Sequence, residues 1–106
     1  MSYRYMRIII FFDLPVETLE QRRYYRSFRK VLINEGFIMM QESVYSKLVL
    51  NNTVGDAIKF KVSRNKPKSG IVQMMTITEK QFESVELLVG DNKSNKLGST
   101  ERLIII

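Results

Sequence analysis

The sequence predicts an α+β fold of the ferredoxin-like type, with the order βαββαβ and one or two extra C-terminal strands. Three observations predict it. Runs rich in β-branched and aromatic residues recur along the chain, two stretches between them have apolar residues at helical spacing, and turn residues separate the segments. The 106 residues fit one domain. We expect a ferredoxin-like domain over residues 1–90 and a loop-and-strand tail over residues 91–106.

The N-terminal part of the chain predicts a strand followed by a helix. The run Met6–Phe12 is β-rich and ends in the turn signal Asp13–Pro15. Thr18 is a candidate N-cap with Gln21 in capping-box register, and the helix should end before Gly36. At 100° per residue, one face of this helix is apolar or aromatic and should face the sheet. Its members are Tyr24, Tyr25, Phe28, Val31 and Leu32.

The middle of the chain predicts a hairpin and a second helix. Phe37–Gln41 and Ser43–Leu50 are expected to be strands, and their close spacing implies a tight turn. The polar residues 51–53 should cap the helix that follows, because Thr53 and Asp56 stand in capping-box register.

The rest of the chain predicts further strands. The second helix should end near Arg64, and the turn Lys66–Gly70 leads to a fourth strand, Ile71–Thr78, which ends in a short helical turn. Val85–Val89 is a candidate fifth strand. Arg102–Ile106 is a candidate last strand.

The first strand is apolar on both of its faces, with Ile8 and Ile10 on one and Ile9 and Phe11 on the other. An antiparallel sheet with one solvated face should instead alternate apolar and polar residues. Because two helices can cover only one face, the sequence predicts that a second copy covers the other, which makes the protein a homodimer.

The chain is basic, with 17 Lys and Arg against 11 Asp and Glu and a net charge of +6. Two basic runs contain no acidic residue. From them we take as candidate nucleic-acid-binding residues Arg22, Arg23, Arg26, Arg29, Lys30, Arg64, Lys66 and Lys68. A charge run can be merely a solvated helix face, but two such runs in so short a chain favour a polyanionic partner.

The chain contains no Cys, His or Trp, which limits the catalytic and metal-binding groups that it can offer. Their absence excludes disulfides, thiolate nucleophiles, Cys-bound zinc and Ser-His pairs within the chain. Carboxylates, Lys, Tyr or a metal with oxygen ligands remain. The N-terminal apolar run is too short to cross a bilayer, so we expect a soluble cytoplasmic protein with no membrane partner.

Asp13, at the C-terminal end of the first strand, is the candidate catalytic and metal-ligating residue, for Mg²⁺ or Mn²⁺. One carboxylate makes a poor site, and a two-fold axis nearby would supply a second. The alternative is that Asp13 satisfies backbone N–H groups before Pro15. Tyr24 and Tyr25 could stack on bases, but their helical angle favours burial.

Six segments, in this order and spacing, carry a resemblance to a known family. They are Met6–Pro15, Tyr25–Lys30, Glu35–Met39, Gln41–Leu48, Asn51–Thr53 and Thr78–Phe82. With them the chain resembles the CRISPR-associated family two proteins, the small subunit of the spacer-acquisition complex, particularly the type II-A branch. The segments cover most of residues 3–90.

The resemblance implies a ferredoxin-like homodimer that holds double-stranded prespacer DNA and bridges two dimers of the larger family-one integrase. It implies that Asp13 is the metal-binding residue. Some relatives are described as metal-dependent endonucleases. The apolar tail should pair with the chain's own dimer or with the integrase, and the resemblance favours the integrase. The tail residues concerned are Leu103, Ile104, Ile105 and Ile106.

Three functions therefore stay open on the sequence alone. The first is a structural DNA-binding adaptor within an integrase complex. The second is a stand-alone metal-dependent endoribonuclease or endodeoxyribonuclease that acts through Asp13. The third is an RNA-binding or regulatory ferredoxin-like domain.

Overall fold

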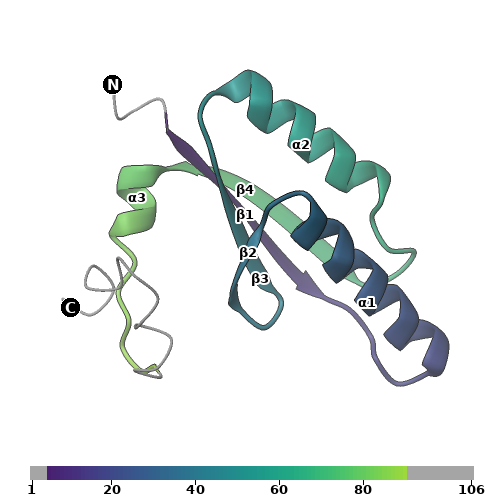
Figure 1. Ribbon diagram of the computed structural model, residues 1–106. Coiled ribbons are helices and arrows are strands. Elements are labelled where there is room, and N and C mark those ends of the chain that lie inside the picture. The colour runs from purple at the N-terminus through teal and green to yellow at the C-terminus, as the bar shows by residue number, and fades with distance from the viewer. Residues whose placement is uncertain (1–4, 91–106) are drawn as a thin grey trace.

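The computed structural model describes residues 5–90, which form an α+β fold with a four-stranded sheet (Figure 1). This confirms the predicted fold class and is compatible with the ferredoxin-like type. The elements are β1 (Met6–Asp13), α1 (Leu19–Asn34), β2 (Ile38–Gln41), β3 (Val44–Val49), α2 (Asn52–Arg64), β4 (Ile71–Thr78) and α3 (Glu79–Glu83).

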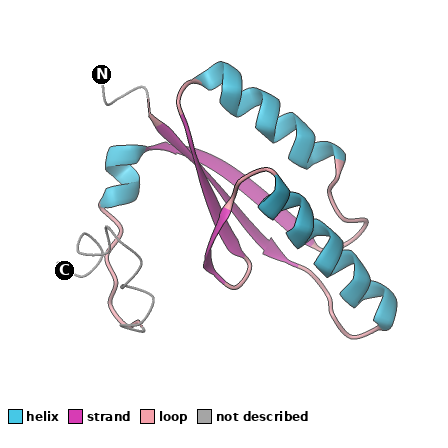
Figure 2. Cartoon of the chain, in the orientation of Figure 1, coloured by secondary structure: helices cyan, strands magenta, loops and turns pink. Residues whose placement is uncertain are grey.

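The sheet has the order β2-β3-β1-β4, and every neighbouring pair is antiparallel. β1 is therefore central, paired with β3 on one side and with β4 on the other. Helices α1 and α2 lie together against one face of this sheet (Figure 2). We call this the helical face and the opposite one the second face.

The hydrophobic core lies between the helical face and the two long helices. Ile8 and Ile10 of β1 are fully buried there against Phe28 and Leu32 of α1, and α2 adds Ile58 and Val62. The ring of Phe12 is central, with its centroid 5.3 Å from that of Phe28, 5.7 Å from that of Tyr45 and 5.8 Å from that of Tyr25. Edge-to-face and stacked ring pairs add to the stability that apolar burial provides.

Each of the three helices within residues 5–90 is capped by a side chain that accepts from the backbone N–H three residues later. At the start of α1, Thr18 accepts a hydrogen bond from the Gln21 backbone N–H, and the Gln21 side chain accepts one from the Thr18 N–H, which confirms the capping box. Thr78 and Gln81 cap α3 in the same way. The prediction that residues 51–53 cap α2 is confirmed, but the capping box between Thr53 and Asp56 is wrong. Asn51 is the N-cap, because its side chain accepts from the Val54 N–H while Thr53 is already helical.

Gly70 allows the start of β4 to approach the end of β1. Its φ is +94°, and a Cβ there would lie 2.8 Å from the Asp13 carbonyl oxygen. Any other residue would therefore combine a left-handed backbone with a steric clash. This close approach fixes the backbone on which Asp13 stands.

The second face is apolar and largely exposed in the single chain. Ile38, Leu48, Ile71 and Met75 point to it by strand register, and all four are more than two-fifths exposed. Ile9, at its centre, is buried. The apolar character of both sheet faces is thus as the sequence predicts.

The short helix α3 contacts the second face through an ion pair. The Arg7 guanidinium donates to both carboxylate oxygens of Glu79, at 2.9 and 2.7 Å, and lies 4.2 Å from the ring centroid of Phe82. A longer contact of 3.5 Å joins Arg7 to the hydroxyl of the buried Ser46. The chain's own third helix therefore covers part of the face that the sequence assigns to a second copy.

The predicted fifth strand is wrong, because Val85–Val89 has no strand conformation. This segment follows α3 and forms no ladder with β4, whose hydrogen-bonding partner is β1. The other candidate strand, Arg102–Ile106, lies outside the described residues. Within residues 5–90, no helix has the length and apolar character needed to cross a membrane.

Candidate nucleic-acid and metal sites

Asp13 is exposed at the end of β1, on the second face. It borders a hollow of about 320 Å³ between β1, the β2–β3 turn and β4. Ser43 and Gln73 line the same hollow, so a hydroxyl group and a side-chain amide border it together with the carboxylate. The rest of the lining is apolar and consists of Phe11, Phe12, Val44 and Ile71.

The donor set around Asp13 suits a hard cation, because it consists of oxygen atoms. It is incomplete within one chain. Residues 5–90 contain no group of three or more acidic residues, Cys or His placed to hold a metal ion. Asp13 also belongs to none of the ion pairs found in this part of the chain. A complete Mg²⁺ or Mn²⁺ site would need further ligands from a second copy or from a nucleic-acid phosphate.

Two of the five basic residues on α1 have structural partners. Arg22 donates to the backbone carbonyls of Val16 and Glu17, at 3.0 and 3.1 Å, and so fixes the loop before the helix. Arg29 donates from Nε to the hydroxyl of the buried Tyr45, at 2.8 Å. That bond satisfies a polar atom which would otherwise lie unpaired in the core.

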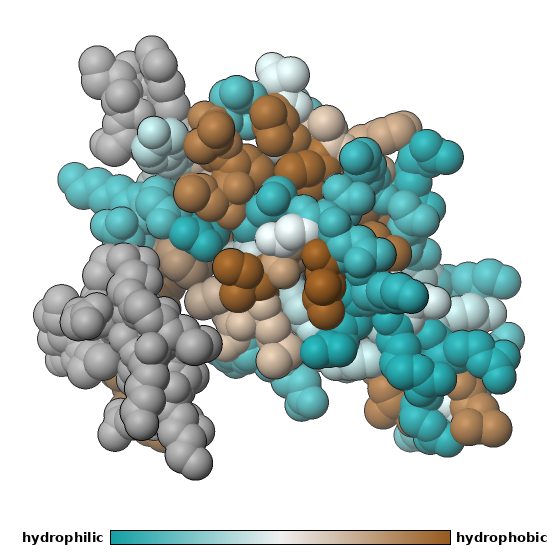
Figure 3. Space-filling view, in the orientation of Figure 1, coloured by the Kyte–Doolittle hydropathy of each residue, from teal (hydrophilic) through white to brown (hydrophobic). Residues whose placement is uncertain are grey.

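Arg23, Arg26 and Lys30 are exposed on the same helix, and none belongs to an ion pair within residues 5–90. Hydrophilic side chains gather over α1 (Figure 3). These three cations are therefore the members of the first basic run that are best placed to meet a polyanion.

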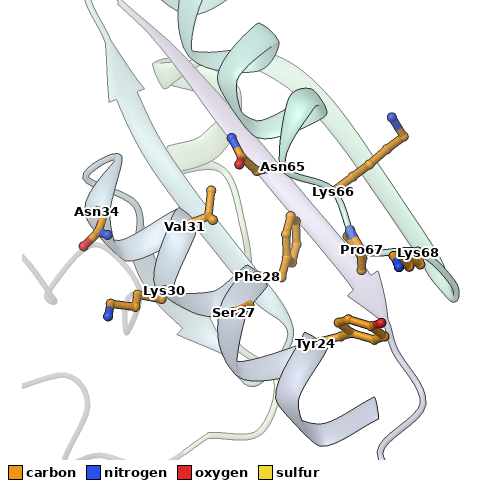
Figure 4. A pocket seen from close by; sticks show the side chains of 10 residues that line it. All are labelled: Tyr24, Ser27, Phe28, Lys30, Val31, Asn34, Asn65, Lys66, Pro67 and Lys68. Atoms are coloured by element: carbon orange, nitrogen blue, oxygen red, sulfur yellow. The ribbon is translucent and has the colours of Figure 1, made fainter. Parts of the chain in front are cut away.

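A groove of about 400 Å³ separates α1 from the loop between α2 and β4 (Figure 4). It brings the two basic runs together, because Lys30 borders it on α1 and Lys66 and Lys68 border it on the loop. The ammonium of Lys68 lies 5.7 Å from the ring centroid of Tyr24. The structure thus places three of the predicted nucleic-acid-binding residues around one groove.

Arg64 lies apart from this groove. Its guanidinium is 5.7 Å from the ring centroid of Phe60, four residues earlier on the outer surface of α2, and Phe60 is largely exposed. The other cations of α2 have acidic partners, since Lys59 pairs with Asp56 at 3.4 Å and Lys61 with Glu35 at 3.8 Å.

Sequence reasoning missed the polar lining of the groove. Tyr24, expected to be in the core, is only half-buried and borders the groove together with Ser27 and Asn34. Ser27 and Asn34 lie on the helix flank between the apolar face and the basic face, which is a signal the sequence does contain, whereas Tyr24 lies on the apolar face. For Asn65, the C-cap of α2, the sequence contains no comparable signal. The predicted partner-binding residues of the tail, Leu103, Ile104, Ile105 and Ile106, lie outside the described residues.

The family model described as CRISPR associated protein Cas2 matches residues 6–85. A protein of Treponema denticola named CRISPR-associated endoribonuclease Cas2 is 52% identical over 101 residues, which cover 95% of this chain and 100% of that protein. Two proteins of the same name are similar. One, from Streptococcus mutans UA159, is 46% identical over 95% of this chain and 93% of its own length, and one from Ligilactobacillus salivarius is 45% identical over 95% and 100%.

Arg29 and Arg26 should differ in their effect on stability. We expect Arg29→Ala to lower the free energy of unfolding by about 1–3 kcal/mol, because it leaves the buried Tyr45 hydroxyl without its partner. Arg26→Ala, the matched control on the same helix, should change it by less than about 0.5 kcal/mol. Urea denaturation measures both, and equal effects would contradict the structural role of Arg29.

Proposed function

The chain belongs to the Cas2 family of CRISPR-associated proteins, and from this premise we propose that it is a cytoplasmic homodimeric adaptor of spacer acquisition. In this role it holds double-stranded prespacer DNA and bridges dimers of the larger family-one integrase. One observation carries the proposal for this chain. The exposed cations of α1 and of the α2–β4 loop lie on the helical side of the sheet, while the second face is apolar.

Duplex binding rests on the exposed cations of α1. Arg and Lys contacts to phosphates give affinity that is independent of base sequence, as a protein that handles arbitrary DNA requires. Arg23 and Arg26 project from one helix without acidic partners in the described part of the chain. Arg22 and Arg29 are exposed as well and keep free donors beside the bonds they make to the protein, so they remain candidate phosphate contacts.

Dimerisation rests on the second face. Four large apolar residues on it, Ile38, Leu48, Ile71 and Met75, are between 43% and 62% exposed. Exposed apolar side chains of this kind are unfavourable in water, and a two-fold contact between identical faces would bury them. Asp13 lies at the edge of this face. A two-fold axis that passed near it would bring the Asp13 carboxylates of the two copies together.

The proposed bridging of integrase dimers rests on membership of the family. The apolar tail residues 103–106 are the proposed contact with the integrase, by strand addition that uses backbone hydrogen bonds for affinity.

A second candidate function is metal-dependent cleavage through Asp13. The names of the relatives, which include the word endoribonuclease, favour it for those proteins. In this chain the exposed Asp13 borders a hollow lined with further oxygen donors, which is compatible with Mg²⁺. A bound divalent ion would supply a hydroxide nucleophile near neutral pH, and Asp13 would be one of its ligands.

Arg26→Glu should weaken binding to duplex DNA, equally for unrelated sequences, because an attraction to a phosphate becomes a repulsion. The slope of log affinity against log salt should fall by about 0.9 for each phosphate that the variant no longer neutralises. Fluorescence anisotropy over a salt series measures this. Lys80→Glu, an exposed charge reversal on α3, is the matched control. An unchanged slope in Arg26→Glu, or an altered preference between sequences, would contradict the proposed role.

Met75→Glu should convert the dimer to monomers, because it places a charge within the buried contact. Val54→Glu is the matched control, since Val54 is 42% exposed on α2 and Met75 is 46% exposed on the second face. Sedimentation velocity at micromolar concentration distinguishes the two. If the unsubstituted protein sediments as a monomer, or if Met75→Glu still dimerises, the second face is not the interface.

Asp13→Asn should lower Mg²⁺-dependent cleavage of RNA or DNA by at least about 100-fold. Loss of a group that only supports a metal ligand costs up to about 100-fold, and loss of the ligand itself should cost at least as much. Integration by the complete complex should persist, because the adaptor role needs only binding. Glu42→Gln, a neighbouring exposed carboxylate on the hairpin turn, is the control. Cleavage in EDTA would contradict the metal role. Loss of integration in a folded Asp13→Asn dimer would contradict the adaptor role.

A further inference from the structure

The groove between α1 and the α2–β4 loop has features that a duplex-binding surface does not need. A duplex rests on exposed cations and requires no cavity, yet this groove has a volume of about 400 Å³, within the range of small-ligand sites. Val31 and Pro67 contribute apolar surface to its lining, with the buried Phe28 behind them, and Figure 4 shows the three between the polar side chains of the two walls.

The polar groups around the groove favour an anion. Lys30, Lys66 and Lys68 border it, with the Lys68 ammonium beside Tyr24, and none of the ten lining residues is acidic. The Lys66 ammonium is held near the loop by a hydrogen bond of 3.3 Å to the Ser63 carbonyl. That bond uses one of its three donors, so two remain for a ligand.

The amide and hydroxyl groups of the lining add selectivity. Asn65 donates from Nδ2 to the Lys61 carbonyl at 2.8 Å, which fixes its side chain at the rim. Ser27 and Asn34 border the opposite wall on α1. These groups can pair with the edge of a planar heterocycle, while the Tyr24 ring, already beside Lys68, offers a face for stacking.

From this juxtaposition we propose that the groove binds one unpaired nucleotide. Its base lies against Tyr24 and the apolar lining, and its phosphate is held by Lys68, with Lys66 and Lys30 at the rim of the groove. A base within a duplex is stacked and paired and cannot enter such a groove, whereas an unpaired base presents both its face and its edge. The site is therefore distinct from the proposed duplex contacts at Arg23 and Arg26, and it does not depend on Asp13.

The test uses the full chain with two probes that share this chemistry. One is a short single-stranded oligothymidylate that carries a fluorophore, and the other is free thymidine monophosphate as a competitor. We expect the oligonucleotide to bind with measurable affinity in fluorescence anisotropy. Competition by the free nucleotide at low concentration would identify a mononucleotide as the natural form of the ligand. Competition only by unlabelled oligonucleotide would identify an unpaired nucleotide within a strand.

Ser27→Phe fills the groove without changing any charge, because Ser27 is exposed on α1 and borders it. We expect it to weaken oligonucleotide binding at least about fivefold, the lower end of what stacking of one base contributes. Duplex affinity should stay within about twofold of the original, which is the precision of such a comparison. Ser63→Phe is the matched control, since Ser63 is exposed on α2 outside the lining.

Lys68→Gln provides a second variant that removes one ammonium and keeps the length of the side chain nearly the same. It should weaken oligonucleotide binding more than Lys80→Gln, a change of the same kind on α3. The proposal is overturned if neither probe binds, or if Ser27→Phe and Ser63→Phe bind the oligonucleotide equally. It is also overturned if Ser27→Phe weakens duplex and oligonucleotide to the same extent, because the groove is then only part of the duplex surface.

Discussion

The structure depends on the position of β1, a central strand that is apolar on both of its faces. Pairing with β3 and β4 satisfies its backbone on both edges, so its side chains decide what lies above and below the sheet. Ile8 and Ile10 require the two long helices, which bury them completely. On the other side Ile9 is buried and Phe11 half-buried. However, α3 covers this face only at the Arg7 end and leaves Ile71 and Met75 exposed. A single chain of this fold therefore leaves one sheet face incompletely covered.

This constraint separates the chemistry of the molecule into two sides. The helices that cover one face of β1 carry the exposed cations outward, and the loop after α2 brings Lys66 and Lys68 beside Lys30. The other side is apolar and has Asp13 at its edge. A polyanion and a protein partner can then bind at the same time without competing for surface. An adaptor requires this separation, whereas a stand-alone nuclease would need its carboxylate and its cations around one substrate.

What the sequence could predict depends on how local the cause is. The capping boxes at Thr18 and Thr78 follow from residues three positions apart, and the strand faces follow from simple alternation. The stretch 51–53 was predicted to cap α2, but the first helical residue was not, because Asn51 and Thr53 are both good N-cap residues and each offers a different start of the helix. The bond from Arg29 to Tyr45 and the groove between distant segments are tertiary features. Residue spacing along the chain does not predict them. The sequence therefore did not distinguish Arg29, which supports the core, from the other arginines of its basic run.

The Arg7 ion pair has a consequence for the second face. A cation on an apolar surface would oppose burial, because removing an unpaired charge from water costs several kcal/mol. Here Glu79 neutralises the guanidinium through two hydrogen bonds, Phe82 covers one side of it, and the Ser46 hydroxyl lies at 3.5 Å. Both side chains are already less than one-fifth exposed in the single chain, so most of their desolvation has occurred on folding. The apolar residues around them can then be buried without leaving this charge unpaired, which removes one electrostatic obstacle to a contact between two such faces.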